Sequence, residues 1–309
     1  MNSISSYVLS LRKWVVYSIL RKLLRIFTEH IQMRKRIIIV KRINMLMYKP
    51  WQNMRKKIFN DRLFQSNFLD INDGYFYSDA STIPFVEEAI KDCKDIIRTK
   101  VDVVKKNYLV NHLDYRDIGK YDGLLRFCTS PILTSTAAKY LGEFPVISGI
   151  EVWNSPLSEA SNNSLVGSQK FHLDNIDTRQ LKVFLNITDI GENNGPLSFI
   201  SESISNKVIA KNEYGNKKNV ERLEDEVVYQ IAKKSDLKQN IGSSGFITGI
   251  DTCRCLHYGS RNCSMGRQVL MVQFTSVARS DTRPFELLSI DVGVHSDYLK
   301  FLFNPFHLT

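Results

Sequence analysis

Three residues in this chain have the side chains and the spacing of a metal site. One residue separates His172 from Asp174, and His257 follows much later in the chain. Successive side chains of a β-strand point to opposite faces, so residues two apart can project into one cavity. Two imidazoles and one carboxylate leave about three octahedral positions open, as in non-haem Fe(II) oxygenases. The pattern predicts a catalytic metal site formed by His172, Asp174 and His257.

A cationic residue follows the distal histidine. Arg267 begins the run RQVLMVQFT, in which alternate residues share one face. The turn-like segment GSRNCSMG separates this run from His257, so we expect His257 and Arg267 on adjacent strands joined by a hairpin. An arginine on the inner face of a barrel needs an anion, and its planar guanidinium suits a carboxylate. We therefore expect Arg267 to bind a dicarboxylate cosubstrate.

Each of these residues has a plainer interpretation when it is taken alone. A His-x-Asp tripeptide occurs by chance, His172 could be a satisfied core histidine, and Arg267 could belong to a structural ion pair. The combination is more specific. It joins the tripeptide to an alternating strand, an Asn-Gly-Pro turn and a distal His257 followed by Arg267.

Four further residues are weaker candidates for supporting the site: Gln169, Lys182, Asn186 and Arg261. Lys182 and Asn186 share one face of the strand predicted over 181–188. The other face is aliphatic and is expected to form core. Lys182 and Asn186 therefore either line the cavity or face solvent. Cys253 and Cys255 precede His257 closely, but this spacing on a strand favours small apolar packing over a thiolate metal site.

The elements that must position these residues can be located by periodicity and by helix and turn signals. A polar, Ser- and Asn-rich loop at 154–168 enters the segment with His172, as a substrate lid or an ordinary surface loop. The charged segment 201–240 is expected to be an insertion. Helices are expected over 83–106, 130–142 and near 220–233, and strands over 145–153, 181–188, 245–250, 256–258 and 267–276.

Two runs together resemble a known family. FHLDNIDTRQLKVFLNITDIGENNGPLSFI and the later CLHYGSRNCSMGRQVLMVQF look like the phytanoyl-CoA dioxygenase family of Fe(II)/2-oxoglutarate oxygenases, over about residues 149–276. The resemblance implies a mainly β fold with flanking helices, built on a double-stranded β-helix (a cupin-like jelly roll). It implies that His172, Asp174 and His257 bind the iron and that Arg267 binds the distal carboxylate of 2-oxoglutarate, with Gln169 and Lys182 as weaker cofactor-binding candidates.

The reaction implied is the O2-dependent decarboxylation of 2-oxoglutarate to succinate and CO2, coupled to hydroxylation of a C–H bond. Asp174 favours hydroxylation, because halogenating relatives carry a small residue there. Many members read Gly-Ser-His where this chain has Ser201-Glu202-Ser203, so the substrate does not follow from the resemblance. We expect a small molecule, a lipid or a glycan. The alternative is a non-catalytic metal-binding jelly roll that its basic N-terminus tethers to a membrane surface.

Positive charge is concentrated at the N-terminus. Residues 1–60 contain 14 Lys/Arg and a single acid, although the whole chain has a net charge of only +10. Basic residues interrupt every apolar run, so a spanning helix is not expected. Residues 1–50 form either a basic amphipathic helix on anionic lipid, a helix packed on the barrel or a free basic arm, with Pro50 ending the segment. Nucleic-acid binding is not expected, because no recognition fold accompanies the charge.

The expected organisation has three parts. A basic helical segment over 1–60 precedes an oxygenase domain over 61–283, whose helical part spans about 83–142 and whose jelly roll spans about 145–276. An apolar tail over 284–309 is expected to pack on the domain or on another subunit. Five cysteines without a Cys-x-x-Cys pair argue against a disulfide framework and favour a reducing compartment. We expect a cytoplasmic protein, with peripheral membrane contact if the basic segment binds lipid.

Overall fold

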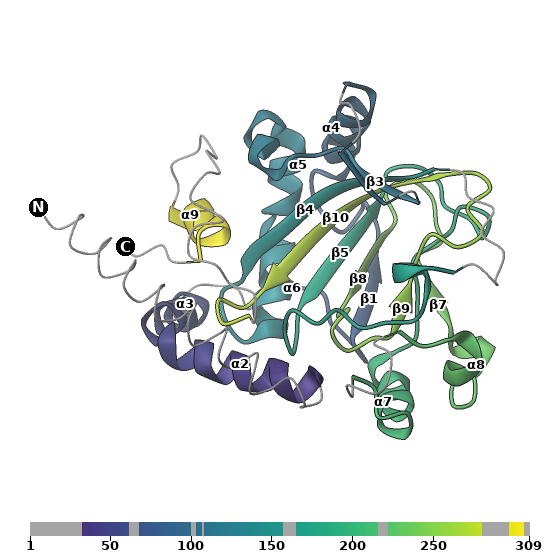
Figure 1. Cartoon of the computed structure of the whole chain (residues 1–309). Helices are drawn as coiled ribbons and strands as arrows, with labels where there is room; N and C mark the ends of the chain where they lie inside the picture. The colour runs from purple at the N-terminus through teal and green to yellow at the C-terminus, as the bar shows by residue number, and fades with distance from the viewer. Residues whose placement is uncertain are drawn as a thin grey trace, which may run out of the picture.

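The computed structural model describes residues 33–61, 68–99, 103–106, 108–156, 165–215, 222–279 and 297–305. In this part of the chain, two antiparallel β-sheets lie against each other (Figure 1). The larger sheet has the order β1-β8-β5-β10-β4-β3-β2, and the smaller has the order β7-β6-β9. This arrangement confirms the predicted jelly roll with flanking helices. The strands are β1 (Tyr75–Ser78), β2 (Val103–Lys106), β3 (Leu109–Asn111), β4 (Val146–Ser155), β5 (Leu181–Asn186), β6 (Ser198–Phe199), β7 (Lys238–Gln239), β8 (Ile247–Ile250), β9 (His257–Tyr258) and β10 (Arg267–Thr275).

The central strands of the larger sheet are buried on both faces. On β5, Leu181, Val183 and Leu185 pack in the core shared with the helices. Lys182 and Phe184 point the other way and line a cavity on the side of the smaller sheet. The side chains of strand β10 alternate between the core and the cavity side in the same manner. The aliphatic face is therefore core, as burial predicts, and the face with Lys182 lines the cavity instead of meeting solvent.

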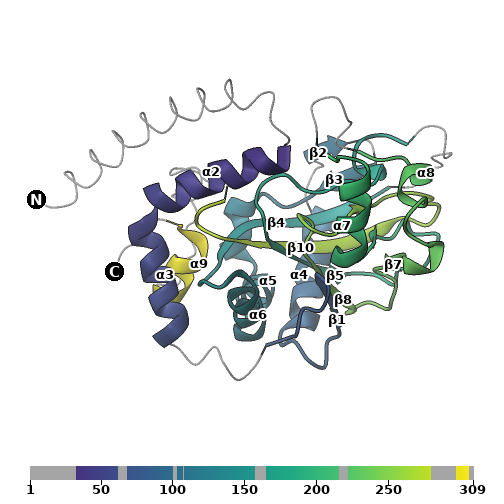
Figure 2. The same cartoon turned by 90° about the horizontal axis from the view of Figure 1, so that it is seen from below.

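Helices α4 (Val86–Thr99), α5 (Asp122–Cys128) and α6 (Pro131–Leu141) supply the apolar side chains that cover the outer face of the larger sheet (Figure 2). Helix α6 confirms the helix predicted over 130–142. Pro131 is its first residue, and Gly142, whose φ of 74° suits a residue without a Cβ, directly follows its last residue. The prediction of one helix over 83–106 is wrong beyond Thr99. Residues 103–106 form β2, which pairs with β3, because β-branched valines suit an edge strand that has a partner.

Helices α2 (Met33–Met47) and α3 (Lys49–Asp61) lie at one end of the larger sheet beside α9 (Asp297–Phe303) (Figures 1 and 2). Arg55 of α3 is fully buried and donates to the carbonyl oxygens of Phe144, Pro145, Phe301 and Asn304 at 2.6–3.1 Å. These bonds attach both end segments of the described chain to the start of β4. In residues 33–61, the basic segment is thus packed on the barrel.

Residues 1–32, which carry most of the predicted amphipathic helix, lie outside the described residues. The prediction that Pro50 ends the segment is wrong. Pro50 lies in the first turn of α3, where its missing N–H removes no helical hydrogen bond. None of the described helices is long and apolar enough to cross a bilayer.

The segment 201–240 contains more regular structure than its polar composition indicates. Helix α7 (Glu202–Lys211) was not expected, and the helix predicted near 220–233 is reduced to α8 (Asp225–Val228), with 216–221 outside the described residues. Apolar residues of α7 and α8 pack against Phe171, Leu256 and Tyr258. The segment therefore covers the back of the smaller sheet, behind both histidines. The candidate lid at 154–168 falls largely outside the described residues, although β4 continues to Ser155 and Gly167–Gln169 form a 3-10 turn.

Candidate metal centre

His172 and His257 lie opposite each other on neighbouring backbone segments. His257 begins β9, and His172 forms an antiparallel bridge with it. Each residue donates its backbone N–H to the other's carbonyl oxygen at 3.0 Å. Directly opposed residues of an antiparallel pair project their side chains from the same face. The two ring centroids are consequently 4.2 Å apart.

Backbone carbonyls orient both imidazoles. Nδ1 of His172 lies 2.9 Å from the carbonyl oxygen of Lys170, and Nδ1 of His257 lies 3.0 Å from that of Cys255. A carbonyl oxygen only accepts, so each Nδ1 carries a proton and each neutral ring presents the lone pair of Nε2. Burial, and secondarily the neighbouring His257, lowers the pKa of His172 to about 3. Burial also lowers the pKa of His257. Both rings are thus neutral ligands at neutral pH.

Asp174 supplies the third candidate metal ligand beside the two histidines. Its backbone N–H donates to the carbonyl oxygen of Thr252 at 2.8 Å, which places the carboxylate beside the imidazoles. One donor atom from each of His172, Asp174 and His257 lies within 4.8 Å of the other two. Among the described residues, this is the one group of His, Cys, Asp and Glu side chains with such a geometry. Burial acts to raise the pKa of Asp174, but the charge of Lys182 holds it well below its usual range, so the carboxyl is ionised.

Arg267 lies in the same cavity and has no carboxylate partner among the described residues. Its guanidinium is buried, and Nη2 donates to the hydroxyls of Ser155 at 3.3 Å and Ser260 at 3.1 Å. No described acidic residue forms an ion pair with it. Burial lowers the pKa of Arg267 to about 10, which still leaves the side chain charged at neutral pH. A buried cation that lacks a counter-ion favours an anionic ligand.

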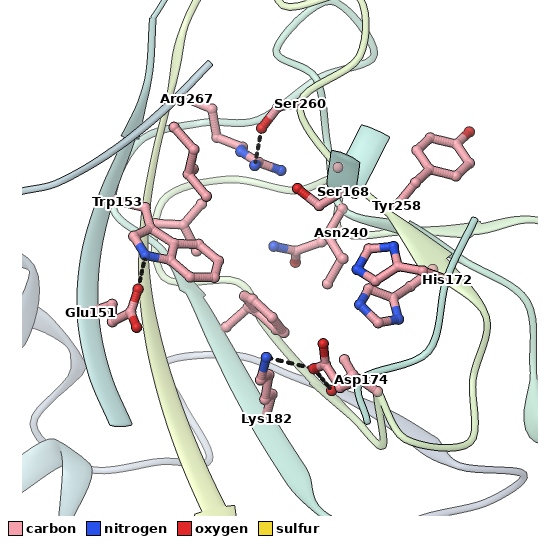
Figure 3. Close-up of a pocket in the computed structure, with 17 residues that line it drawn as sticks. Glu151, Trp153, Ser168, His172, Asp174, Lys182, Asn240, Tyr258, Ser260 and Arg267 are labelled. Carbon is pink, nitrogen blue, oxygen red and sulfur yellow. Dashed lines mark hydrogen bonds and ion pairs between the residues drawn. The ribbon is translucent and has the colours of Figure 1, made fainter. Parts of the chain in front are cut away.

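The predicted hairpin between His257 and Arg267 is wrong. Strand β9 pairs with β6 in the smaller sheet, whereas β10 lies between β4 and β5 in the larger sheet. The turn-like segment 259–266 therefore crosses from one sheet to the other. As a result, the histidines and Arg267 occupy different sides of one cavity (Figure 3).

The cavity has a volume of about 250 Å³. Polar groups lie at both ends, with the His–Asp–His group at one and Arg267 with Ser260 at the other (Figure 3). Apolar side chains, including Trp153 and Phe184, form much of the wall between them. The lining residues are Leu109, Glu151, Trp153, Ser168, His172, Asp174, Lys182, Phe184, Leu197, Asn240, Thr252, His257, Tyr258, Gly259, Ser260, Arg267 and Val269.

Of the four weaker candidates, only Lys182 lines this cavity. Gln169 is buried behind it and donates to the carbonyl oxygen of Ser260 at 2.8 Å. Asn186 accepts from the Asn240 amide at 2.7 Å, which links β5 to the segment after β7. Arg261 pairs with Asp225 at 2.8 Å and stacks over Tyr258. These three support the walls of the site.

Cys253 and Cys255 are buried free thiols, and burial raises the pKa of each well above the usual value. This disfavours the thiolate form that binds metals.

Sequence reasoning did not identify four polar residues that hold the site. Ser155 and Ser260 bind Arg267, and Gln180 and Thr252 bind Asp174. Ser260 has a φ of 58°, unusual for a residue other than glycine. The contacts of Ser155 and Thr252 join segments that are distant in the chain. Ser260 and Gln180 lie seven and six residues from their partners, but these spacings match no recognisable motif.

No protein-family model and no curated protein sequence matches the chain. Several solved structures are similar to it at low identity. EctD from S. alaskensis, solved with 2-oxoglutarate and 5-hydroxyectoine, is 14% identical over 67% of this chain and 73% of that chain, with a TM-score of 0.46. SnoN, the non-heme alpha ketoglutarate dependent epimerase from nogalamycin biosynthesis, is 14% identical over 66% and 78%, with a TM-score of 0.42. AviO1 from Streptomyces viridochromogenes Tue57 is 13% identical over 75% and 98%, with a TM-score of 0.42.

Proposed function

We propose that this protein is an Fe(II)/2-oxoglutarate-dependent dioxygenase of the phytanoyl-CoA dioxygenase type, which hydroxylates a C–H bond of a small-molecule, lipid or glycan substrate. One observation carries the proposal. The His–Asp–His group and a buried arginine without a described counter-ion lie at opposite ends of one cavity. The first suits a divalent metal and the second suits the distal carboxylate of a dicarboxylic acid.

The residues present fit a ferrous ion. Two imidazoles present Nε2 lone pairs because their Nδ1 atoms are engaged by carbonyls, and Asp174 supplies an ionised oxygen. Three protein ligands leave positions open for a chelating cosubstrate and for O2. When bound, the ion with 2-oxoglutarate and O2 supplies the oxidising chemistry that yields succinate, CO2 and a hydroxylated product.

The surrounding side chains bind and orient the reactants. Arg267, held by Ser155 and Ser260, binds the distal carboxylate and thereby directs the keto acid end of the molecule toward the histidines. Trp153 and Phe184, which lie against each other with ring centroids 6.0 Å apart, exclude water from the space between the two ends. A dry cavity strengthens both the ion pair with Arg267 and the binding of the metal.

The test measures succinate formed from 2-oxoglutarate by Fe(II)-loaded protein under air. We expect turnover that requires Fe(II) and is lost in His172→Ala and in Asp174→Ala. Met265→Ser, at an exposed position away from the cavity, is the matched control and should leave turnover unchanged. Protein that binds metal through the triad but consumes no 2-oxoglutarate with any candidate substrate would indicate the alternative, a non-catalytic metal-binding jelly roll.

A second proposal concerns peripheral contact with an anionic membrane. Helix α2 has no acidic residue, and its outward face alternates basic and apolar side chains. Lys35, Ile38, Arg42 and Met45 follow helical spacing on this face, and Leu46 beside them is 75% exposed. An exposed helix face of this composition suits the boundary between lipid headgroups and acyl chains.

The membrane proposal is tested with point variants, because deleting residues 1–50 would also remove the contacts of α2 with the barrel. The partition coefficient from sedimentation with phosphatidylserine-containing vesicles should fall about 100-fold or more in Ile38→Ser/Leu46→Ser, since the two aliphatic side chains together contribute about 3 kcal/mol or more when buried in lipid. Val166→Ser, an exposed apolar residue elsewhere, should bind like the parent. Unchanged binding of the double variant would exclude α2 as the contact.

A further inference from the structure

The two oxygens of the Asp174 carboxylate have different surroundings. Oδ2 accepts from Thr252 Oγ1 at 2.6 Å, Lys182 Nζ at 2.7 Å and Gln180 Nε2 at 3.0 Å. Oδ1 accepts no hydrogen bond from any described residue. Figure 3 shows Lys182 reaching Asp174 from the side of the cavity away from Arg267. One oxygen is therefore saturated and the other is available.

The strongest of the three donors is Lys182. It projects from the inner face of β5 and is largely shielded from solvent, with a side-chain exposure of 14%. Its Nζ lies 2.7 Å from Oδ2 of Asp174, so the two side chains form an ion pair that is largely shielded from solvent. A charge-assisted bond between shielded partners is stronger than a neutral one.

Lys182 consequently cancels the charge of the Asp174 carboxylate before a metal binds. A metal ligand usually gains donor strength from a carboxylate or carbonyl partner. A cationic partner has the opposite effect, because it withdraws electron density from the carboxylate and repels a divalent ion. Nothing in the proposed chemistry requires a lysine here, so its presence needs a separate explanation.

We propose that Lys182, with Thr252 and Gln180, keeps Oδ2 of Asp174 out of the coordination shell, so that the carboxylate binds the metal through Oδ1 alone. This inference rests on the proposed function. Lys182 is a positioning residue in this role. A one-oxygen carboxylate preserves a coordination position for 2-oxoglutarate, and the nearby ammonium favours the dianionic cosubstrate over water. Lys182 thereby lowers the affinity of the site for the metal ion alone and raises the affinity of the metal-loaded site for 2-oxoglutarate.

Replacing Lys182 with methionine has opposite consequences for the two ligands. The shielded carboxylate loses its counter-charge, so a divalent ion becomes its best available partner. Both oxygens also become able to bind the ion. We therefore expect Lys182→Met to bind Co(II) about tenfold more tightly and to bind 2-oxoglutarate, once Co(II) is loaded, about tenfold more weakly. A lysine that served only to hold the fold together would predict weaker metal binding.

The experiment titrates the full-length protein anaerobically with Co(II), which reports coordination through its visible absorption, and then titrates the loaded protein with 2-oxoglutarate. Lys182→Met should show tighter Co(II) binding, weaker 2-oxoglutarate binding and lower visible absorptivity, as expected when a second carboxylate oxygen coordinates. Thr252→Val, which removes a neutral donor from the same oxygen, should shift both affinities in the same directions by about two- to threefold. It also keeps the test decisive if Lys182→Met does not fold. Lys120→Met, at an exposed ion pair with Asp117, is the matched control for loss of one positive charge.

Unchanged or weaker Co(II) binding in the folded Lys182→Met or Thr252→Val variants overturns the inference while leaving the proposed function intact. The His172→Ala variant distinguishes a failure of this inference from a failure of the proposed metal centre. If the parent protein binds Co(II) equally well with and without His172, the metal centre itself is wrong and the inference falls with it. If binding depends on His172 but Lys182→Met behaves like Lys120→Met, only the role of Lys182 is refuted.

Discussion

Replacing Asp251 with asparagine removes one buried ionisable group and leaves the shape of its surroundings nearly unchanged. Asp251 follows β8 and is fully buried. Its Oδ2 accepts from the Tyr140 hydroxyl at 2.7 Å, and its Oδ1 accepts from the backbone N–H groups of Cys253 at 2.9 Å and Gln180 at 3.4 Å. Burial raises the pKa of Asp251 from 3.8 to about 7, despite the opposing effect of these hydrogen bonds.

The sign of the effect follows from proton linkage. Because the folded-state pKa lies above the unfolded value, the folded protein binds the Asp251 proton more tightly. The resulting stability is fully present below about pH 4 and is lost as the pH rises through about 7. The shift of about 3 pKa units corresponds to about 4 kcal/mol in total, of which about 3 kcal/mol falls between pH 5 and pH 8.

Asp251→Asn is neutral throughout this range and retains an oxygen that can accept from both backbone N–H groups. The assay is urea unfolding of the parent and the variant at several pH values. The difference between their unfolding free energies should shift by about 3 kcal/mol in favour of the variant from pH 5 to pH 8. Taking the difference cancels the opposite contribution of His172 and His257, whose lowered pKa values make the protein more stable as the pH rises. Parallel stability curves would refute the argument, because they would show that Asp251 titrates alike in both states.

Arg55→Ala should lower the unfolding free energy by about 3 kcal/mol or more, since it leaves four carbonyl oxygens without their donor. The exposed control Lys56→Ala should change it by less than about 0.5 kcal/mol. Equal effects of the two variants in denaturant melts would contradict the role of Arg55 in joining α3, β4 and α9. Arg267→Leu should weaken 2-oxoglutarate binding about 100-fold with Co(II) affinity unchanged, because the lost ion pair is shielded from water; a parallel loss of Co(II) affinity would indicate a disrupted fold. Gly249→Ala should destabilise the protein by roughly 1–3 kcal/mol, since a Cβ would lie 1.9 Å from the Phe76 ring; an unchanged melting temperature would show that this ring moves freely.

Local patterns predicted several elements correctly. Proline and glycine at the two ends defined α6, and alternation located β5 and β10, because these signals act within a few residues of one another. The helix predicted over 83–106 shows the limit of such reasoning. Its last four described residues form an edge strand, since pairing with β3 outweighs helical periodicity. The prediction for the polar segment 201–240 missed helix α7 for a similar reason, because this helix is stabilised by packing against the smaller sheet.

The sequence likewise predicted some features of the candidate site and not others. Residue types and short spacings were sufficient to select His172, Asp174, His257 and Arg267, because the capacity to bind a metal or a carboxylate belongs to the side chains themselves. They were insufficient to orient Lys182, since a strand with two plausible faces does not reveal which one meets a cavity.

Only the tertiary structure placed the two histidines side by side through the bridge between His172 and His257. It also showed that the turn after His257 crosses between sheets, so that Arg267 lies at the opposite end of the cavity from the metal ligands. The same holds for the partners of the site, because Thr252 meets Asp174 and Ser155 meets Arg267 only after distant segments have packed. The amino-acid sequence specifies which groups can react. Long-range backbone pairing determines which groups meet, because no local spacing encodes a contact between segments that are distant in the chain.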